Sequence, residues 1–217
     1  MEALKAVETS AGDLGLLGGE LCLDFVNTLG WRLRPYPTEY LCAIRDLIHW
    51  SRQLGAITKR DAELLEKTAT ASPAKAAEVL ANAIKLREGT YRIFAALAAG
   101  SKAAHSDLRE FNDILAPLLS NTGLVPGESA GNANARTLAW GWNGARNALE
   151  RLLWPVAWSA ANLLGSDPSR VRQCEGEGCG WLFLDTSKNG RRQWCSMKGC
   201  GNRAKARRHY EKRKSSV

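Results

Sequence analysis

Four cysteines near the C-terminus have the spacing of a metal site. Cys174 and Cys179 form one Cys-x4-Cys pair, and Cys195 and Cys200 form a second pair after fifteen intervening residues. Two close pairs of thiolates supply the four ligands that a tetrahedral Zn²⁺ site needs. Because cysteine would fill all four positions, no position stays open for water, and the metal is expected to be structural. The sequence predicts one structural zinc ion per chain.

A strongly basic segment surrounds and follows the second cysteine pair. Residues 188–214 contain eleven lysines and arginines and one acid, Glu211, whereas the rest of the chain has nineteen basic and twenty-one acidic residues. A local excess of positive charge behind a metal site is typical of surfaces that bind polyanions. The residues predicted to bind nucleic acid are Arg191, Arg192, Arg203, Lys205, Arg207, Arg208, Lys212 and Arg213.

The basic segment is predicted to end in a helix over residues 202–213. Arg203, Arg207, Tyr210 and Lys214 fall on one stripe of this helix. Because the helix has almost no apolar face, a metal cluster at its base must set its direction. A cationic helix of this kind suits contact with phosphates or insertion into a groove.

The segment between the two cysteine pairs is expected to form a hairpin. Two short apolar pieces, residues 181–184 and 193–194, are joined through the turn sequence Lys188–Asn189–Gly190. A module of roughly 40 residues buries too little apolar area to fold without help, so zinc is expected to stabilise it.

The residues before the cysteines show the 3,4 spacing of apolar side chains that is typical of helices. Residues 120–135 are rich in Asn, Gly, Ser and Pro and are predicted to form a loop, with a short strand following at 138–142. One predicted helix starts at Thr38–Glu39 and stops at Gly55, and the next starts at Thr58 with Asp61 as its capping partner. Two further helices are predicted to start at Ser72–Pro73 and at Ser106. The last covers residues 146–164, with a kink near Pro155.

Two polar residues interrupt an apolar run near the N-terminus. Asp24 and Asn27 lie within residues 18–28, which are predicted to be either a buried strand or the first turns of a helix. Buried polar groups need partners, and either internal hydrogen bonds or a small-molecule ligand can supply them. Cys22 and Cys42 are expected to be small buried hydrophobes.

Composition limits the classes of protein that fit. The chain has 217 residues, 45% of them apolar and 24% charged, and a net charge of +8. Charges interrupt every apolar stretch well before the roughly 18 residues of a membrane span, and residues 1–13 are expected to be a loose terminus rather than a signal peptide. We therefore expect a cytoplasmic protein without disulfides.

The residues around the cysteines resemble a known family. The string Cys200–Gly201–Asn202–Arg203, with the paired cysteines, is similar to the CGNR zinc finger, and Leu23–Asp24–Phe25–Val26–Asn27–Thr28 resembles the start of the ABATE domain. In that family the ABATE domain precedes the finger, and the proteins are regarded as stress-induced transcription regulators. The resemblance implies a mainly α fold with a small β component: a multihelical ABATE-like domain at 14–165 and a CGNR zinc finger at 170–214, built from a β-hairpin and a basic C-terminal helix.

The favoured interpretation is a DNA-binding transcription regulator that is not an enzyme. Its N-terminal domain would sense a small-molecule effector or form a homodimer. An RNA-binding protein is the first alternative, with Trp181, Trp194 or Tyr210 as stacking platforms. The second is a small-molecule-binding or enzymatic N-terminal domain, although the sequence contains no nucleophile motif, phosphate loop or HExxH.

Overall fold

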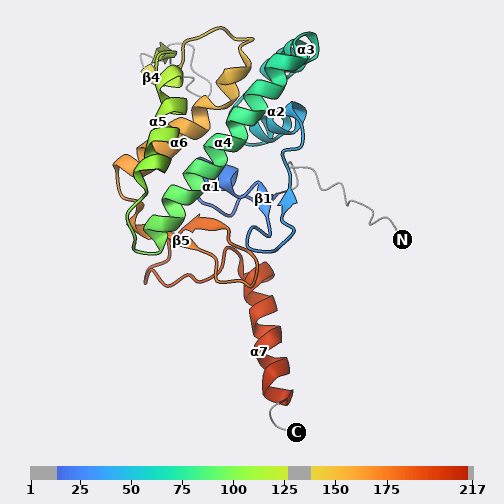
Figure 1. The fold of residues 1–217 in the computed structure, drawn as a ribbon, viewed down its shortest axis with the longest axis vertical. Coiled ribbons are helices and arrows are strands. Elements are labelled where there is room, and N and C mark those ends of the chain that lie inside the picture. The colour runs from blue at the N-terminus through green and yellow to red at the C-terminus, as the bar shows by residue number, and fades with distance from the viewer. Residues whose placement is uncertain (1–13, 127–137, 215–217) are drawn as a thin grey trace, which may run out of the picture.

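Seven α-helices and three two-stranded hairpins make up most of the described chain (Figure 1). The structure is a computed structural model that describes residues 14–126 and 138–214. The helices are α1 (Leu21–Val26), α2 (Ile44–Gln53), α3 (Lys59–Ala71), α4 (Pro73–Ala98), α5 (His105–Leu119), α6 (Trp154–Gly165) and α7 (Asn202–Lys214). The antiparallel pairs are β1 (Leu29–Gly30) with β2 (Thr38–Glu39), β3 (Thr122–Pro126) with β4 (Leu138–Trp142), and β5 (Val171–Gln173) with β6 (Leu182–Leu184). The predicted mainly α fold with a small β component is confirmed.

Helix α4 is the central element, and it packs against α1, α2, α3 and α5. Pro73 stands in its first turn, where the missing N–H costs nothing, as the sequence predicts. Its buried side chains include Val79, Leu86 and Phe94, which meet the buried face of α1 in one core. This core places α1 and the loop after it directly beside the segment that carries the cysteines.

The starts of α2 and α3 show how local sequence sets helix boundaries. The predicted start of α2 at Thr38–Glu39 is wrong, because these residues pair with β1 as strand β2. The helix begins at Ile44, where the Asp46 carboxylate accepts a hydrogen bond of 2.8 Å from the Ala43 N–H. The capping box of Thr58 and Asp61 at the start of α3 is confirmed.

Three other boundaries differ from the prediction. Ser106 lies inside α5, which begins at His105. Residues 122–126 form strand β3 rather than loop, while 127–135 fall outside the described residues. Residues 146–164 divide into a 3₁₀ turn, η2 (Leu149–Leu152), and α6, because Pro155 lacks an N–H and is tolerated in a first turn rather than in a helix interior.

The metal segment contains a hairpin, but its strands are not the predicted ones. Strand β6 pairs with β5, with Gln173 opposite Leu182, instead of with residues 193–194. A 3₁₀ turn, η3 (Pro168–Arg170), leads into β5, and Val171 and Leu182 are buried in the same core as α1 and α4. The hairpin and the N-terminal helices therefore share one core.

The two isolated cysteines lie in different environments. Cys22 is buried in α1, as predicted, whereas Cys42 is exposed, so its prediction as a buried hydrophobe is wrong. Cys42 stands between β2 and α2, where the chain runs at the surface. Among the described helices, none is long and apolar enough to cross a membrane.

Candidate metal centre and nucleic-acid interface

The four predicted ligands form one buried cluster. The sulfur atoms of Cys174, Cys179, Cys195 and Cys200 all lie within 4.8 Å of one another. The Sγ–Sγ distances are 3.8 Å for Cys179–Cys195 and 3.7 Å for Cys195–Cys200. A tetrahedral site with Zn–S bonds of about 2.3 Å places its sulfurs about 3.8 Å apart. The donor set and its spacing therefore fit a zinc ion.

Tight backbone turns bring the sulfurs together. Cys174 follows β5, and its N–H donates to the Trp181 carbonyl oxygen at 2.8 Å, which closes the first turn. Gly176 lies against the cluster, since a Cβ there would stand 2.7 Å from the Cys200 Sγ. The second pair is joined by a π-turn, η4 (Met197–Gly201), which the Ser196 hydroxyl caps by accepting from the Gly199 N–H.

Hydrogen-bond donors and a cation surround the sulfurs. Backbone N–H groups of Gly176 and Cys195 donate to the Cys174 Sγ at 3.4 and 3.3 Å. Arg203, the first arginine of α7, donates from its Nη2 to the Cys200 Sγ at 3.0 Å. Such contacts orient metal ligands and stabilise thiolate charge. They also tie the first turn of α7 to the cluster.

Hydrogen bonds among the sulfurs shift the pKa values of three of the four thiols. Hydrogen bonds from Cys179 and Cys195 lower the pKa of Cys174 to about 2. The same interaction with Cys174 raises the pKa of Cys179 to about 12 and raises the pKa of Cys195 further. Cysteine ligands bind zinc as thiolates, so zinc binding at this cluster would release protons.

A loop from the N-terminal part docks on the cluster. The N–H groups of Arg32 and Leu33 donate to the carbonyl oxygens of Cys179 and Gly178 at 3.1 and 3.3 Å. Trp181 of the finger donates from Nε1 to the Leu29 carbonyl oxygen at 3.1 Å. These hydrogen bonds join β1 and the loop after it to the metal segment.

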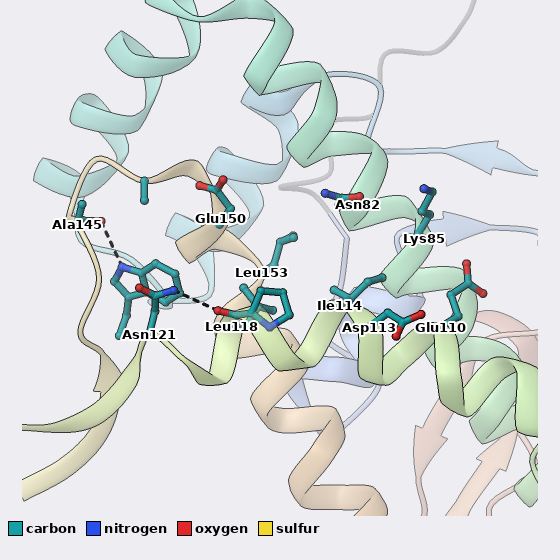
Figure 2. Close-up of a pocket in the computed structure, with 13 residues that line it drawn as sticks. Asn82, Lys85, Glu110, Asp113, Ile114, Leu118, Asn121, Ala145, Glu150 and Leu153 are labelled. Carbon is teal, nitrogen blue, oxygen red and sulfur yellow. Dashed lines mark hydrogen bonds between the residues drawn. The ribbon is translucent and has the colours of Figure 1, made fainter.

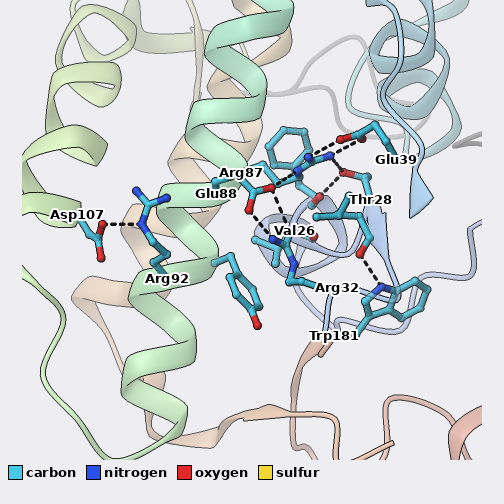
Figure 3. A network of polar contacts seen from close by, with 12 residues as sticks. Val26, Thr28, Arg32, Glu39, Arg87, Glu88, Arg92, Asp107 and Trp181 are labelled. Carbon is cyan, nitrogen blue, oxygen red and sulfur yellow. Dashed lines mark hydrogen bonds and ion pairs between the residues drawn. The ribbon is translucent and has the colours of Figure 1, made fainter. Parts of the chain in front are cut away.

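A network of buried charges holds this loop in place (Figure 3). Arg32 pairs with Glu88 of α4 and donates to the Val26 carbonyl oxygen at 3.0 Å. Arg87, which is 2% exposed, donates to both carboxylate oxygens of Glu39 at 2.6 Å. Burial lowers the pKa of Arg87, but Glu39 and Glu88 outweigh that effect and raise it. Burial raises the pKa of Glu88, but Arg32 and Arg87 outweigh that effect and hold it below its ordinary value.

Two family models match the chain. Residues 170–213 match the CGNR zinc finger. Residues 19–167, more than half of the chain, match ABATE, described as "Putative stress-induced transcription regulator". The chain belongs to the ABATE family. No curated protein matches it. The resemblance inferred from the sequence is confirmed, and the cysteine cluster is the possible zinc site of the CGNR finger.

The predicted basic helix of the CGNR finger is α7, and Figure 1 shows it extending away from the rest of the fold. None of its thirteen residues is buried within the described chain. Arg207 pairs with Glu177 and also lies near Glu211, and Arg208 lies over the Trp194 ring at 5.9 Å. The cationic side chains Arg203, Lys205, Arg207, Arg208, Lys212 and Arg213 all belong to this helix.

The two predicted nucleic-acid residues outside α7 differ from each other. Arg191 is exposed. Arg192 instead donates to the carbonyl oxygens of Leu17, Trp194 and Cys195. Its guanidinium also lies over the Phe183 ring at 4.2 Å. Arg192 therefore braces the finger, and its predicted contact with nucleic acid stays a prediction.

The predicted polar pair, Asp24 within α1 and Asn27 at its C-terminal cap, has partners inside the ABATE protein. Asn27 donates to the Leu182 carbonyl oxygen and accepts from the Leu182 N–H, both at 2.9 Å. Asp24 accepts from the Gly18 N–H at 2.8 Å, and burial raises its pKa. Both side chains thus have the internal hydrogen bonds that the sequence allowed as an alternative, and a ligand at Asp24 and Asn27 stays a prediction.

A cavity lies elsewhere in the ABATE segment, between α4, α5 and η2 (Figure 2). Its volume is about 680 Å³. Ile114, Leu118 and Leu153 supply apolar lining, with carboxylates at Asp113 and Glu150. Neither Asp24 nor Asn27 lines it. Helical periodicity places Leu118 and Leu153 on apolar faces, but only the packing of α4 against α5 creates the cavity beside them.

Sequence reasoning missed the loop that docks on the finger. Residues 31–37 read Trp–Arg–Leu–Arg–Pro–Tyr–Pro, with two arginines and two prolines in seven residues. Prolines restrict the backbone and arginines add positive charge, so this run of residues could have predicted an ordered, basic loop. Its proximity to the cysteines, about 140 residues later in the chain, depends on tertiary structure.

Proposed function

We propose that this ABATE-family protein is a DNA-binding transcription regulator whose helix α7 contacts the DNA duplex. The observation that carries the proposal is α7 itself, which extends from the metal cluster and buries none of its thirteen described residues. Residues 202–214 contain seven lysines and arginines against one acid. A helix fits the major groove of B-DNA, and a cationic one gains affinity by releasing counterions from phosphates.

The zinc cluster would act as the base that aims this helix. With no apolar face, α7 has no packing of its own to fix its direction, whereas Arg203 and the π-turn tie its first turn to Cys200. We propose that Lys205, Arg207, Arg208, Lys212 and Arg213 contact phosphates, with Arg191 at the edge of the same surface. When bound, zinc would supply a rigid tetrahedral link between the two cysteine pairs.

The test is a salt titration of duplex binding by the full zinc-loaded chain. If α7 neutralises about five phosphates, the log–log slope of affinity against salt is roughly −4 to −5. The double change Arg207→Ala and Arg208→Ala should reduce that slope by ~2 and weaken binding to all sequences alike. Binding with an unchanged slope after truncation at Asn202 would contradict the proposal.

One observation keeps RNA as the alternative. Tyr210 is 69% exposed on α7, where it could stack on a base. The other two candidate platforms are partly buried: Trp181 is held by its hydrogen bond to Leu29, and Trp194 packs against the cysteine cluster. A Tyr210→Ala variant that loses affinity for single-stranded RNA but not for duplex DNA would favour the RNA interpretation.

We propose that the ABATE segment, residues 14–165, has a regulatory rather than a catalytic role, through effector sensing or homodimerisation. The CGNR module at 170–214 would be the part that binds DNA, and the protein would act in the cytoplasm. The two family descriptions, a regulator and a zinc finger, support this division of roles. The cavity of about 680 Å³ is within the usual size range of small-molecule sites and could hold an effector. A screen of metabolites by thermal shift, repeated with Leu153→Trp to fill the cavity, tests this role.

A further inference from the structure

The loop over residues 31–37, which connects β1 with β2, is held in one conformation by the finger. Two backbone hydrogen bonds join it to Cys179 and Gly178. Trp31, its first residue, has a φ of 52°, in the left-handed region that non-glycine residues rarely adopt. Such a conformation persists only where the surroundings impose it, and strained residues of this kind cluster at functional sites.

Three guanidinium groups gather where this loop meets α7. The guanidinium carbon of Arg34 lies 3.7 Å from the centroid of the Trp31 ring, and that of Arg203 lies 4.7 Å from the same centroid. Arg34, Arg203 and Arg207 line one cavity of about 80 Å³. Glu177 is the one carboxylate among the described residues that line it, and it already pairs with Arg207. The cavity therefore has excess positive charge.

The outer face of the loop is open to solvent. Arg34 is exposed and has no carboxylate partner among the described residues, while Tyr36 is 89% exposed. An arginine that is positioned by stacking and lacks an acid presents its planar donor fork to an incoming phosphate. The loop thus offers a fixed cation on the same side of the cluster as the first turns of α7.

We propose that the loop 31–37 is part of the nucleic-acid interface, with Arg34 binding a phosphate of the DNA duplex that α7 contacts. This inference rests on the proposed function and extends the interface from the finger into the ABATE segment. The phosphate lies at the cavity that Arg34 shares with Arg203 and Arg207. Because Arg32 in the same loop pairs with Glu88 of α4, the contact links the ABATE core to DNA.

The experiment measures anisotropy of a short fluorescent DNA duplex against salt, with zinc-loaded full-length variants. Arg34→Ala should weaken binding to every sequence and reduce the salt slope by about 0.9, the value for one phosphate. Arg34→Lys keeps the charge and should restore the slope. The matched control is Arg60→Ala, which removes an exposed arginine of α3. Figure 1 shows α3 at the opposite end of the fold from α7, so the slope of this variant should equal that of the wild type.

The outcomes separate this inference from the proposed function. If Arg207→Ala with Arg208→Ala lowers the slope while Arg34→Ala does not, DNA binding stands and the loop lies outside the interface. If Arg34→Lys binds as poorly as Arg34→Ala, with the wild-type slope in both, the arginine only supports Trp31, and the inference fails. A wild-type protein that binds no duplex, or an Arg34 dependence found only with single-stranded RNA, overturns both proposals.

Discussion

Asn27, the residue that caps the C-terminal end of α1, and Leu182 of β6 exchange two hydrogen bonds of 2.9 Å across 155 positions of the chain. The side-chain amide of Asn27 acts as a peptide group would in a neighbouring strand, because it offers one donor and one acceptor to the backbone of Leu182. Both residues are buried. This pair joins the helical segment to the metal segment, so the stability of each should depend on the other.

Replacement of Asn27 by alanine should therefore destabilise the whole chain. The Asn27→Ala variant leaves a buried N–H and a buried carbonyl oxygen of Leu182 without partners, which costs about 2–4 kcal/mol in unfolding free energy. Asn162→Ala, at an exposed position of α6, is the control and should change stability by less than about 0.5 kcal/mol. Urea unfolding measures the stability of both variants and the wild type. Equal urea midpoints for Asn27→Ala and the wild type would show that the Asn27–Leu182 hydrogen bonds contribute nothing to stability.

The purified chain should contain one zinc ion, and its removal should affect more than the finger. Cys195→Ser removes one of the four clustered sulfurs, and it should abolish stoichiometric zinc and lower the melting temperature of the helical core, because Val171 and Leu182 are buried in that core. Cys42→Ser changes an exposed cysteine outside the cluster and should leave both quantities unchanged. Elemental analysis and circular dichroism provide the readouts. Full zinc content in Cys195→Ser would contradict the ligand assignment.

Gly176 is required by close approach to the cluster. A Cβ at this position would stand 2.7 Å from the Cys200 Sγ, so Gly176→Ala should displace a ligand and weaken zinc affinity by at least about tenfold. Gly165→Ala is the matched control, since a Cβ there meets nothing within 4 Å. Competition with a chromogenic chelator measures zinc affinity in both. Identical affinities would mean that the turn can shift without cost.

Asp61 should make stability depend on pH in the acid range. Burial raises its pKa, but hydrogen bonds from Arg146 and Thr58 and the charge of Arg151 outweigh that effect and lower the pKa to about 2. Because the folded-state pKa is below the unfolded value of about 3.9, the stabilisation is present above about pH 4 and is lost as the pH falls toward 2.

Asp61→Asn should accordingly cost about 1–2 kcal/mol at pH 7 and progressively less below pH 4. Asp113→Asn, at an exposed position of α5, serves as the control. Urea unfolding of the three proteins across this pH range gives the comparison. If the unfolding free energies of Asp61→Asn and the wild type differ by the same amount at all pH values, the ion pairs of Asp61 are not the source of that difference.

The sequence by itself determined the features that depend on neighbouring residues. The spacing of the cysteines predicted the cluster, the charge pattern predicted α7, and the Thr58–Asp61 capping box predicted the start of α3. Each of these rests on contacts within a few residues or on ligand types that recur at fixed spacing. Such interactions are specified by a short stretch of chain and form in many different tertiary environments.

Only the tertiary structure decided which distant groups became partners. Strand β6 pairs with β5 instead of the later segment 193–194, because Val171 and Leu182 can then be buried against α1 and α4. Tertiary packing also brings Asn27 to Leu182, and Arg34 and Arg203 to the Trp31 ring. Burial of apolar area is non-directional and sums over the whole chain, so no local pattern specifies which surfaces it brings together.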